Sequence, residues 1–213
     1  MTSGTREQPR APLGSLGEVV SKYVWNLQRA VLADHRESAV VVQMARLRHA
    51  ASSEPGSVPA VWPETIDLVP TRLQGGDEPS TSERAAHVAV TLFALHQQGR
   101  ATPMHRAGGS LGSAARALSV ATDREVAIRR RFQAIALSDT DAGIVHHLRS
   151  LVTLLRGSNI PLDYGRLADD LHTLFERRHP ERVRLRWGRD FRPRSQRPDS
   201  DEESTDDTND TER

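Results

Sequence analysis

Residues 141–156 read DAGIVHHLRSLVTLLR, and this stretch decides the fold class. Its apolar side chains recur three or four positions apart, which places them on one face of an α-helix. They are Ile144, Leu148, Leu151, Val152 and Leu155. Arg149 and Arg156 lie seven residues apart and share a separate face. The stretch therefore predicts a helix that buries one side and presents arginines on another.

The same helical spacing recurs on both sides of this stretch. We expect further helices over 16–33, 38–50, 80–95, 110–118, 122–135 and 163–175. Three pairs have the spacing of a capping box, in which a hydroxyl and an acidic side chain close the start of a helix. They are Ser80 with Glu83, Thr122 with Glu125, and Ser138 with Asp141. No segment shows the sustained alternation and hairpin turns of paired strands.

Proline and glycine mark the loops between these helices. Segment 54–70 holds Pro55, Pro59, Pro63 and Pro70, so we expect it to be mostly loop, and 99–109 forms a second loop. In 183–187, apolar residues alternate with arginine, which is typical either of extended chain or of the end of a helix. The predicted fold class is all-α, as one or more compact helical bundles. The proline-rich segment 54–79 could separate two small helical subdomains.

The two ends of the chain differ from its middle in composition. Residues 1–14 are rich in Pro, Gly, Ser and Thr, and residues 196–213 are polar and acidic, so both are predicted to be disordered tails. Between them we expect one helical domain at 15–195. Residues 199–213 carry eight acidic residues and one arginine. Residues 1–198 therefore carry 28 basic and 20 acidic residues, which makes a cationic body with an anionic tail.

Arginine supplies all but one of the basic residues, and its planar guanidinium suits phosphate. Clusters of arginine on several predicted helices indicate contact with the backbone of nucleic acid, independent of sequence. The alternative is a solvated surface whose arginines pair with acidic residues of the same chain. Aromatic residues make up only 4% of the chain, which argues against a base-stacking platform. The candidate nucleic-acid-binding residues are Arg46, Arg48, Arg106, Arg129, Arg130, Arg149, Arg156, Arg184, Arg186 and Arg189.

The sequence offers no pattern typical of an enzyme. It has no cysteine, and its nine histidines form no H-E-x-x-H motif, so we expect no catalytic residue, metal, cofactor or small-molecule substrate. Asp169 and Asp170 follow Arg166 by three and four residues, which predicts an ion pair on a helix surface. The glycine-rich turn at 108–112 lacks the lysine of a P-loop and is interpreted as a flexible turn before a helix capped by Ser110.

Nothing in the sequence indicates a membrane protein or a secreted one. The longest apolar run is far shorter than a transmembrane span, and no secretory signal opens the chain. The absence of cysteine fits a reducing compartment. We therefore expect a cytoplasmic protein without membrane contact.

A set of short motifs follows one another in a specific order over residues 16 to about 192. They are LFALHQQ at 92–98, Met104-His105, Ser110-Leu111-Gly112, RRRF at 129–132, His147-Leu148-Arg149, IPLDY at 160–164 with LADDL at 167–171, and VRLRWGRDF at 183–191. Trp25 and MARLR at 44–48 fit the same set. Together these segments resemble the CasB family, the small subunit of the type I-E CRISPR surveillance complex Cascade.

The resemblance implies an all-helical, non-catalytic subunit, present as two copies in a complex built on a CRISPR guide RNA. Its expected partners are the guide RNA, the target DNA, a second copy of itself, and subunits of the CasA, CasC, CasD and CasE families. In such a complex base pairing reads the sequence, while the protein holds the guide–target hybrid and the displaced strand by shape and charge.

The resemblance also assigns individual arginines. By motif position, the basic residues that face nucleic acid in this family fall on Arg46 or Arg48, on Arg129 or Arg130, and on Arg149. The assignment extends by local motif to three further residues, which could instead serve a subunit interface. They are Arg184, Arg186 and Arg189.

Two other classes of function stay open. The arginines could bind acidic faces of partner proteins, which would make the chain a purely structural helical adaptor. A helical DNA-binding regulator would need a recognition helix, and the sequence has no clear helix-turn-helix pattern. The acidic tail could compete with nucleic acid for the arginines, or it could serve only solubility.

Overall fold

The computed structural model describes residues 11–35 and 37–192, and within these ranges the chain is built from α-helices. The helices are α1 Ser15–Leu32, α2 Ser38–Ala50, α3 Trp62–Thr65, α4 Thr81–Gln97, α5 Leu111–Thr122, α6 Glu125–Leu137, α7 Asp141–Gly157, α8 Tyr164–Glu176 and α9 Pro180–Phe191. Short 3₁₀ turns cover Pro59–Val61 and Thr71–Leu73. No strand occurs in the described ranges, where an isolated bridge joins His105 to Leu162. The all-α prediction is confirmed.

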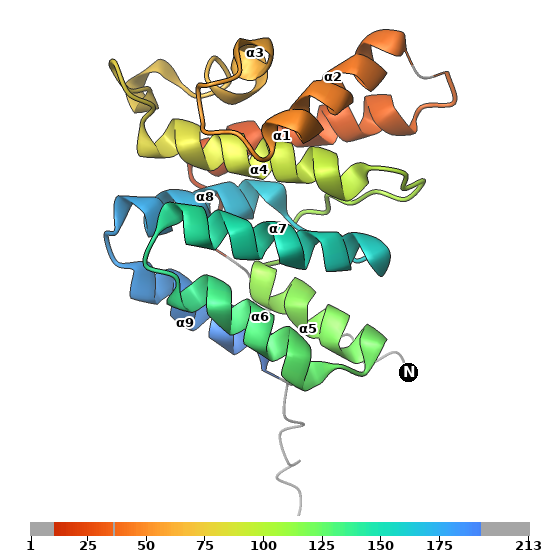
Figure 1. The fold of residues 1–213 in the computed structure, drawn as a ribbon, viewed down its shortest axis with the longest axis vertical. Helices are drawn as coiled ribbons and strands as arrows, with labels where there is room; N and C mark the ends of the chain where they lie inside the picture. The colour runs from red at the N-terminus through yellow and green to blue at the C-terminus, as the bar shows by residue number, and fades with distance from the viewer. Residues whose placement is uncertain (1–10, 36, 193–213) are drawn as a thin grey trace, which may run out of the picture.

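The helices stack in layers along the long axis of the molecule (Figure 1). Helices α1, α2 and α3 lie at one end, α4 crosses next to them, α7 and α8 follow, and α5, α6 and α9 close the other end. Buried apolar side chains from α1 to α9 form one cluster. None of the described helices combines the length and the apolar character that crossing a membrane requires.

The predicted boundaries of the chain have different outcomes. Segment 54–70 is mostly loop, with one short α-helix, α3, and the 3₁₀ turn before it, and 99–109 contains no helix, as expected. The domain limits at 15 and 195 and the division at 54–79 stay predictions. The predicted tail at 196–213 lies outside the described residues, and so does most of the tail at 1–14.

Helix α4 is the central element, and it packs against α1, α2, α3, α7 and α8. Apolar and small residues surround its axis, which is typical of a helix buried on nearly all sides. One of its buried polar groups finds a partner from α8, since His96 Nδ1 lies 2.8 Å from the Tyr164 hydroxyl. Ser80 and Glu83 form the predicted capping box at its start. This helix therefore fixes the position of α2 relative to α7.

Two of the three predicted capping boxes are wrong. Helix α5 continues past residue 118 until Asp123 adopts a left-handed conformation with φ 51°. Thr122 is therefore the last residue of α5, and its hydroxyl donates to the Leu118 carbonyl. Helix α7 is capped by Thr140, whose hydroxyl accepts from the Gly143 N–H at 3.1 Å, while Ser138 ends α6. The three-residue spacing alone does not identify a helix start.

The alternating segment 183–187 belongs to helix α9, which resolves the choice left open by the sequence. Val183, Trp187 and Phe191 are buried at intervals of four residues, whereas Leu185 is 54% exposed. Helix α5 approaches the backbone of α9 closely at Trp187. A Cβ at Gly112 would overlap the Trp187 carbonyl oxygen, so glycine allows the two helices to meet.

The prediction of a surface ion pair at Asp169 and Asp170 is wrong, because both carboxylates bind groups from other helices. Asp170 is buried and accepts from the Trp187 indole N–H at 2.6 Å and from the Arg186 guanidinium. Asp169 accepts from the backbone N–H of Gly14 at 2.7 Å, at the start of α1. Burial raises the pKa of Asp170 to about 6, although Arg186 acts in the opposite direction.

Candidate nucleic-acid interface

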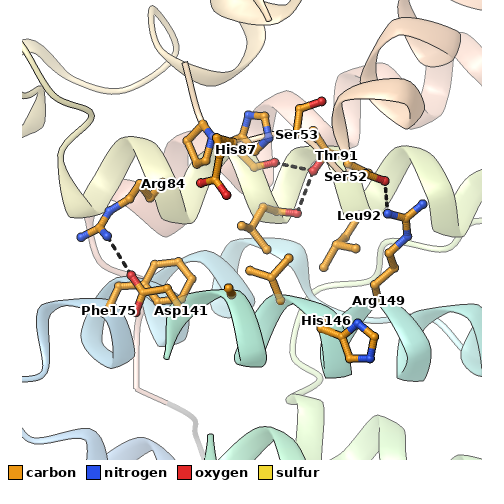
Figure 2. A pocket seen from close by; sticks show the side chains of 16 residues that line it. Ser52, Ser53, Arg84, His87, Thr91, Leu92, Asp141, His146, Arg149 and Phe175 are labelled. Atoms are coloured by element: carbon orange, nitrogen blue, oxygen red, sulfur yellow. Dashed lines mark hydrogen bonds and ion pairs between the residues drawn. The ribbon is translucent and has the colours of Figure 1, made fainter. Parts of the chain in front are cut away.

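The two arginines of α7 point toward α4 and the loop that follows α2. Arg149 donates to the Ser52 hydroxyl across this space (Figure 2). Arg156 lies two turns further along α7, a rise of about 10 Å. It donates to the Gln98 side-chain oxygen at 2.9 Å, just after the end of α4. The expected common face of these two residues is therefore the face that borders α4.

Two further arginines border the same end of α4. A hollow of about 400 Å³ lies there, lined by Arg48 of α2 and by Gln98 and Arg100 of the loop that follows α4. Arg100 also donates to the Asn159 side-chain oxygen at 3.2 Å, directly after α7. Four guanidiniums from α2, α7 and the loop after α4 thus gather around the C-terminal half of α4. We call these residues the α4-end cluster: Arg48, Arg100, Arg149 and Arg156.

The partners of this cluster are electrically neutral. Arg149 binds a hydroxyl, Arg156 and Arg100 bind amide oxygens, and Arg156 also reaches the Leu95 carbonyl oxygen at 3.5 Å. Among residues 11–35 and 37–192, no carboxylate lies within ion-pair distance of these guanidiniums. A neutral acceptor leaves the full positive charge and most of the N–H donors of each guanidinium free to bind phosphate.

The predicted arginines of α6 and α9 have a different environment. Arg129 forms an ion pair with Glu125 and lies over the Phe191 ring, at 5.1 Å from its centre. Arg186 binds the buried Asp170. Arg186 thus has a structural role at a buried carboxylate, whereas the Arg129 pair lies on the surface. Their assignment to nucleic acid stays a prediction.

The remaining candidates lie on several separate faces. Arg46 and Arg48 are two positions apart, which turns Arg46 to the opposite side of the buried stripe of α2 by about 200°. The same geometry separates Arg184 from Arg186 on α9. Arg130 and Arg189 are exposed on α6 and α9, and Arg106 lies in the loop beside Leu162. Of the ten predicted residues, the structure thus brings three together around α4.

Sequence reasoning missed Arg100 as a member of the group. It lies in a loop, and its neighbours Arg48 and Asn159 are each more than 50 positions away in sequence. No local pattern could have paired them.

A metal site was also considered for the histidines. Within the described ranges no group of three or more His, Asp or Glu side chains is placed to hold an ion.

The comparisons with known proteins agree with the predicted resemblance. Residues 43–191 match the family model of the CRISPR-associated protein Cse2. The chain belongs to the Cse2 family. The matched region runs from the middle of α2 to the end of α9 and includes the whole α4-end cluster. No curated protein sequence gave a match to this member of the Cse2 family.

Three solved structures have the same fold as this chain. The crystal structure of CasB from Thermobifida fusca superposes with a TM-score of 0.69 at 32% identity, over 84% of this chain and 99% of that one. A Cse2 family protein from Thermus thermophilus gives a TM-score of 0.62 at 26% identity, over 82% and 96%. A chain of a CRISPR RNA-guided surveillance complex shares the fold, with a TM-score of 0.65 at 20% identity, over 83% and 92%.

Proposed function

We propose that this chain is a non-catalytic small subunit of a type I-E CRISPR RNA-guided surveillance complex, in which it binds nucleic-acid backbone through the α4-end cluster. The observation that carries the proposal is the group of guanidiniums around α4 whose described partners are neutral. Membership of the Cse2 family and the shared fold with a chain of a surveillance complex support it. Such contacts stabilise binding to any sequence and weaken with salt.

The proposed setting follows from the family. The chain would work in the cytoplasm with the guide RNA, the target DNA, a second copy of itself, and CasA, CasC, CasD and CasE subunits. Base pairing would select the target, and the cluster would hold phosphates of the hybrid or of the displaced strand. The other predicted arginines remain proposed contacts that the cluster does not require.

A purely structural adaptor is the second candidate, and one observation favours it. Val41 and Val42 of α2 are 48% and 47% exposed, and Val41 lines the same hollow as Arg48 and Arg100. Apolar side chains beside arginines are typical of the core of a protein interface. In this case the cluster would bind an acidic face of another subunit.

Crosslinking in the assembled complex distinguishes the two candidates. We would assemble the complex with guide RNA and a photoreactive target DNA, crosslink it, and map the modified peptides. Backbone binding predicts crosslinks at 48–52 and 98–100 and on α7, which the double substitution Arg149→Ala and Arg156→Ala weakens. Arg182→Ala removes an exposed arginine of α9 and serves as the control. Crosslinks from these peptides to protein only would favour the adaptor.

A further inference from the structure

A cavity of about 290 Å³ lies between α4, α7 and the loop after α2 (Figure 2). Its wall is partly apolar, with Val88 and Leu92 from α4 and Val145 from α7. Ser52 and Arg149 stand at one end of it. The volume is near the lower limit of cavities that bind small ligands. Neither membership of the Cse2 family nor the proposed binding of nucleic-acid backbone assigns a role to this cavity.

The two ends of the cavity differ in the partners of their arginines. At one end Arg84 and Arg177 share the Asp141 carboxylate, at 2.8 Å and 3.1 Å, and this carboxylate would repel an incoming anion. At the other end the Arg149 guanidinium binds the Ser52 hydroxyl, which carries no charge. An anion entering the cavity would therefore be held at the Arg149 end. Glu54 lies at the rim and is exposed to solvent, where its charge is screened.

A buried histidine closes part of the wall between α4 and the loop after α2. His87 is 2% exposed, and its Nε2 lies 3.1 Å from the Ala50 carbonyl oxygen. Because a carbonyl only accepts, Nε2 carries the proton and Nδ1 is left with a lone pair. Burial lowers the pKa of His87, which keeps the ring neutral. Nδ1 has no hydrogen-bond partner in the described chain, but solvent does not reach this atom, so the ring offers the cavity a neutral surface and no acceptor.

We propose that this cavity binds one nucleotide unit, with its base against Val88, Leu92 and Val145 and its phosphate at Arg149. A nucleotide combines the two properties that match this cavity: a ring that can pack against apolar side chains, and an anion at one end. The unit can be a nucleotide turned out of a bound strand or a free mononucleotide. The strand form rests on the proposed function, because the same Arg149 belongs to the α4-end cluster.

Filling the cavity tests the proposal. Ala142→Phe and, separately, Val145→Phe place a ring in the cavity from α7, and Ser150→Phe places the same ring on the exposed side of α7 as a control. Each full-length variant is first checked for an unchanged circular dichroism spectrum. Binding is then measured to single-stranded DNA with ordinary bases, to the same strand with abasic sites, and to a nucleoside 5′-monophosphate.

We expect the unchanged protein and Ser150→Phe to bind the ordinary strand about tenfold more tightly than the abasic strand. Folded Ala142→Phe or Val145→Phe should lose that difference. Mononucleotide binding that these variants abolish, without any preference for the ordinary strand, supports the cavity with the free nucleotide as its ligand. The proposal is overturned if the unchanged protein shows neither a preference for the ordinary strand nor binding of the mononucleotide. It is also overturned if both folded variants keep the preference for the ordinary strand.

Arg149→Ala separates this proposal from the proposed function. Suppose that Arg149→Ala lowers the affinity for the ordinary and the abasic strand equally, and that the unchanged protein does not distinguish the two strands. The nucleotide-binding cavity is then refuted, while the proposed binding of nucleic-acid backbone is supported. If Arg149→Ala changes neither affinity nor salt dependence, the proposed function fails at this residue, and so does the role of Arg149 in the cavity.

Discussion

The arginines around α4 and a second set with carboxylate partners look alike in sequence but differ in what they bind. The second set is Arg129, Arg177, Arg178 and Arg186. Arg149 and Arg156 bind a hydroxyl and an amide, whereas Arg186 binds the buried carboxylate of Asp170. A guanidinium on a buried carboxylate has its charge compensated within the bundle, and removing one partner exposes the other to an unfavourable environment. A guanidinium on a neutral acceptor keeps its charge for an outside partner. The partner of each arginine, more than their number, therefore indicates which of them can bind nucleic acid.

The largest expected effect is on stability, from Asp170→Ala. The substitution leaves the Trp187 indole N–H and the Arg186 guanidinium without their acceptor at a buried position. We expect the free energy of unfolding to fall by about 3 to 4 kcal/mol in urea titrations. A loss below about 0.5 kcal/mol would contradict the structural role of this carboxylate.

A smaller effect is expected from pH, again at Asp170. Its folded-state pKa of about 6 lies above the ordinary value of 3.8, so the folded protein holds this proton more tightly than the unfolded chain. The free energy of unfolding should therefore fall as pH rises from about 4 to 6, by up to about 3 kcal/mol relative to Asp170→Asn, which cannot titrate. Parallel pH profiles of the two proteins would contradict this prediction, because they would mean that burial does not raise the pKa of Asp170.

The smallest effect is expected from Ser52→Ala, which tests the neutral acceptor of Arg149. Loss of the hydroxyl frees the guanidinium without changing any charge. We expect DNA affinity to fall by only about twofold, with an unchanged salt slope. Ser150→Ala, at an exposed position of α7, is the control. The contrary result is a decrease in the slope of log affinity against log salt as large as the loss of one arginine would cause. It would mean that Ser52 does more than orient Arg149.

Most of the fold was predictable because helix periodicity is local. The stripe from Ile144 to Leu155 is buried as predicted, and helix α2 has the expected ends. The errors have two causes. Thr122 failed as a cap because the neighbouring Asp123 ends α5 later than predicted, which is a local effect. Asp170 was expected on the surface but is buried, because Trp187 of another helix packs on it.

The candidate site was predictable only within single helices. The spacing of Arg149 and Arg156 on α7 correctly placed them on one face. The gathering of Arg48 and Arg100 beside them depends on the packing of α2 on α4 and on the loop that follows α4. Composition could not separate arginines with neutral partners from those bound to carboxylates, such as Arg129 and Arg186. That distinction needs the coordinates of both partners.

The most direct test compares two sets of four Arg→Gln substitutions with equal loss of charge, measuring the slope of log affinity against log salt for single-stranded DNA. One variant changes the α4-end cluster. The other changes arginines within ion-pair distance of carboxylates: Arg129, Arg177, Arg178 and Arg186. We predict that the cluster variant loses about three units of slope and the matched variant less than about one. Equal losses in the two variants would contradict the account.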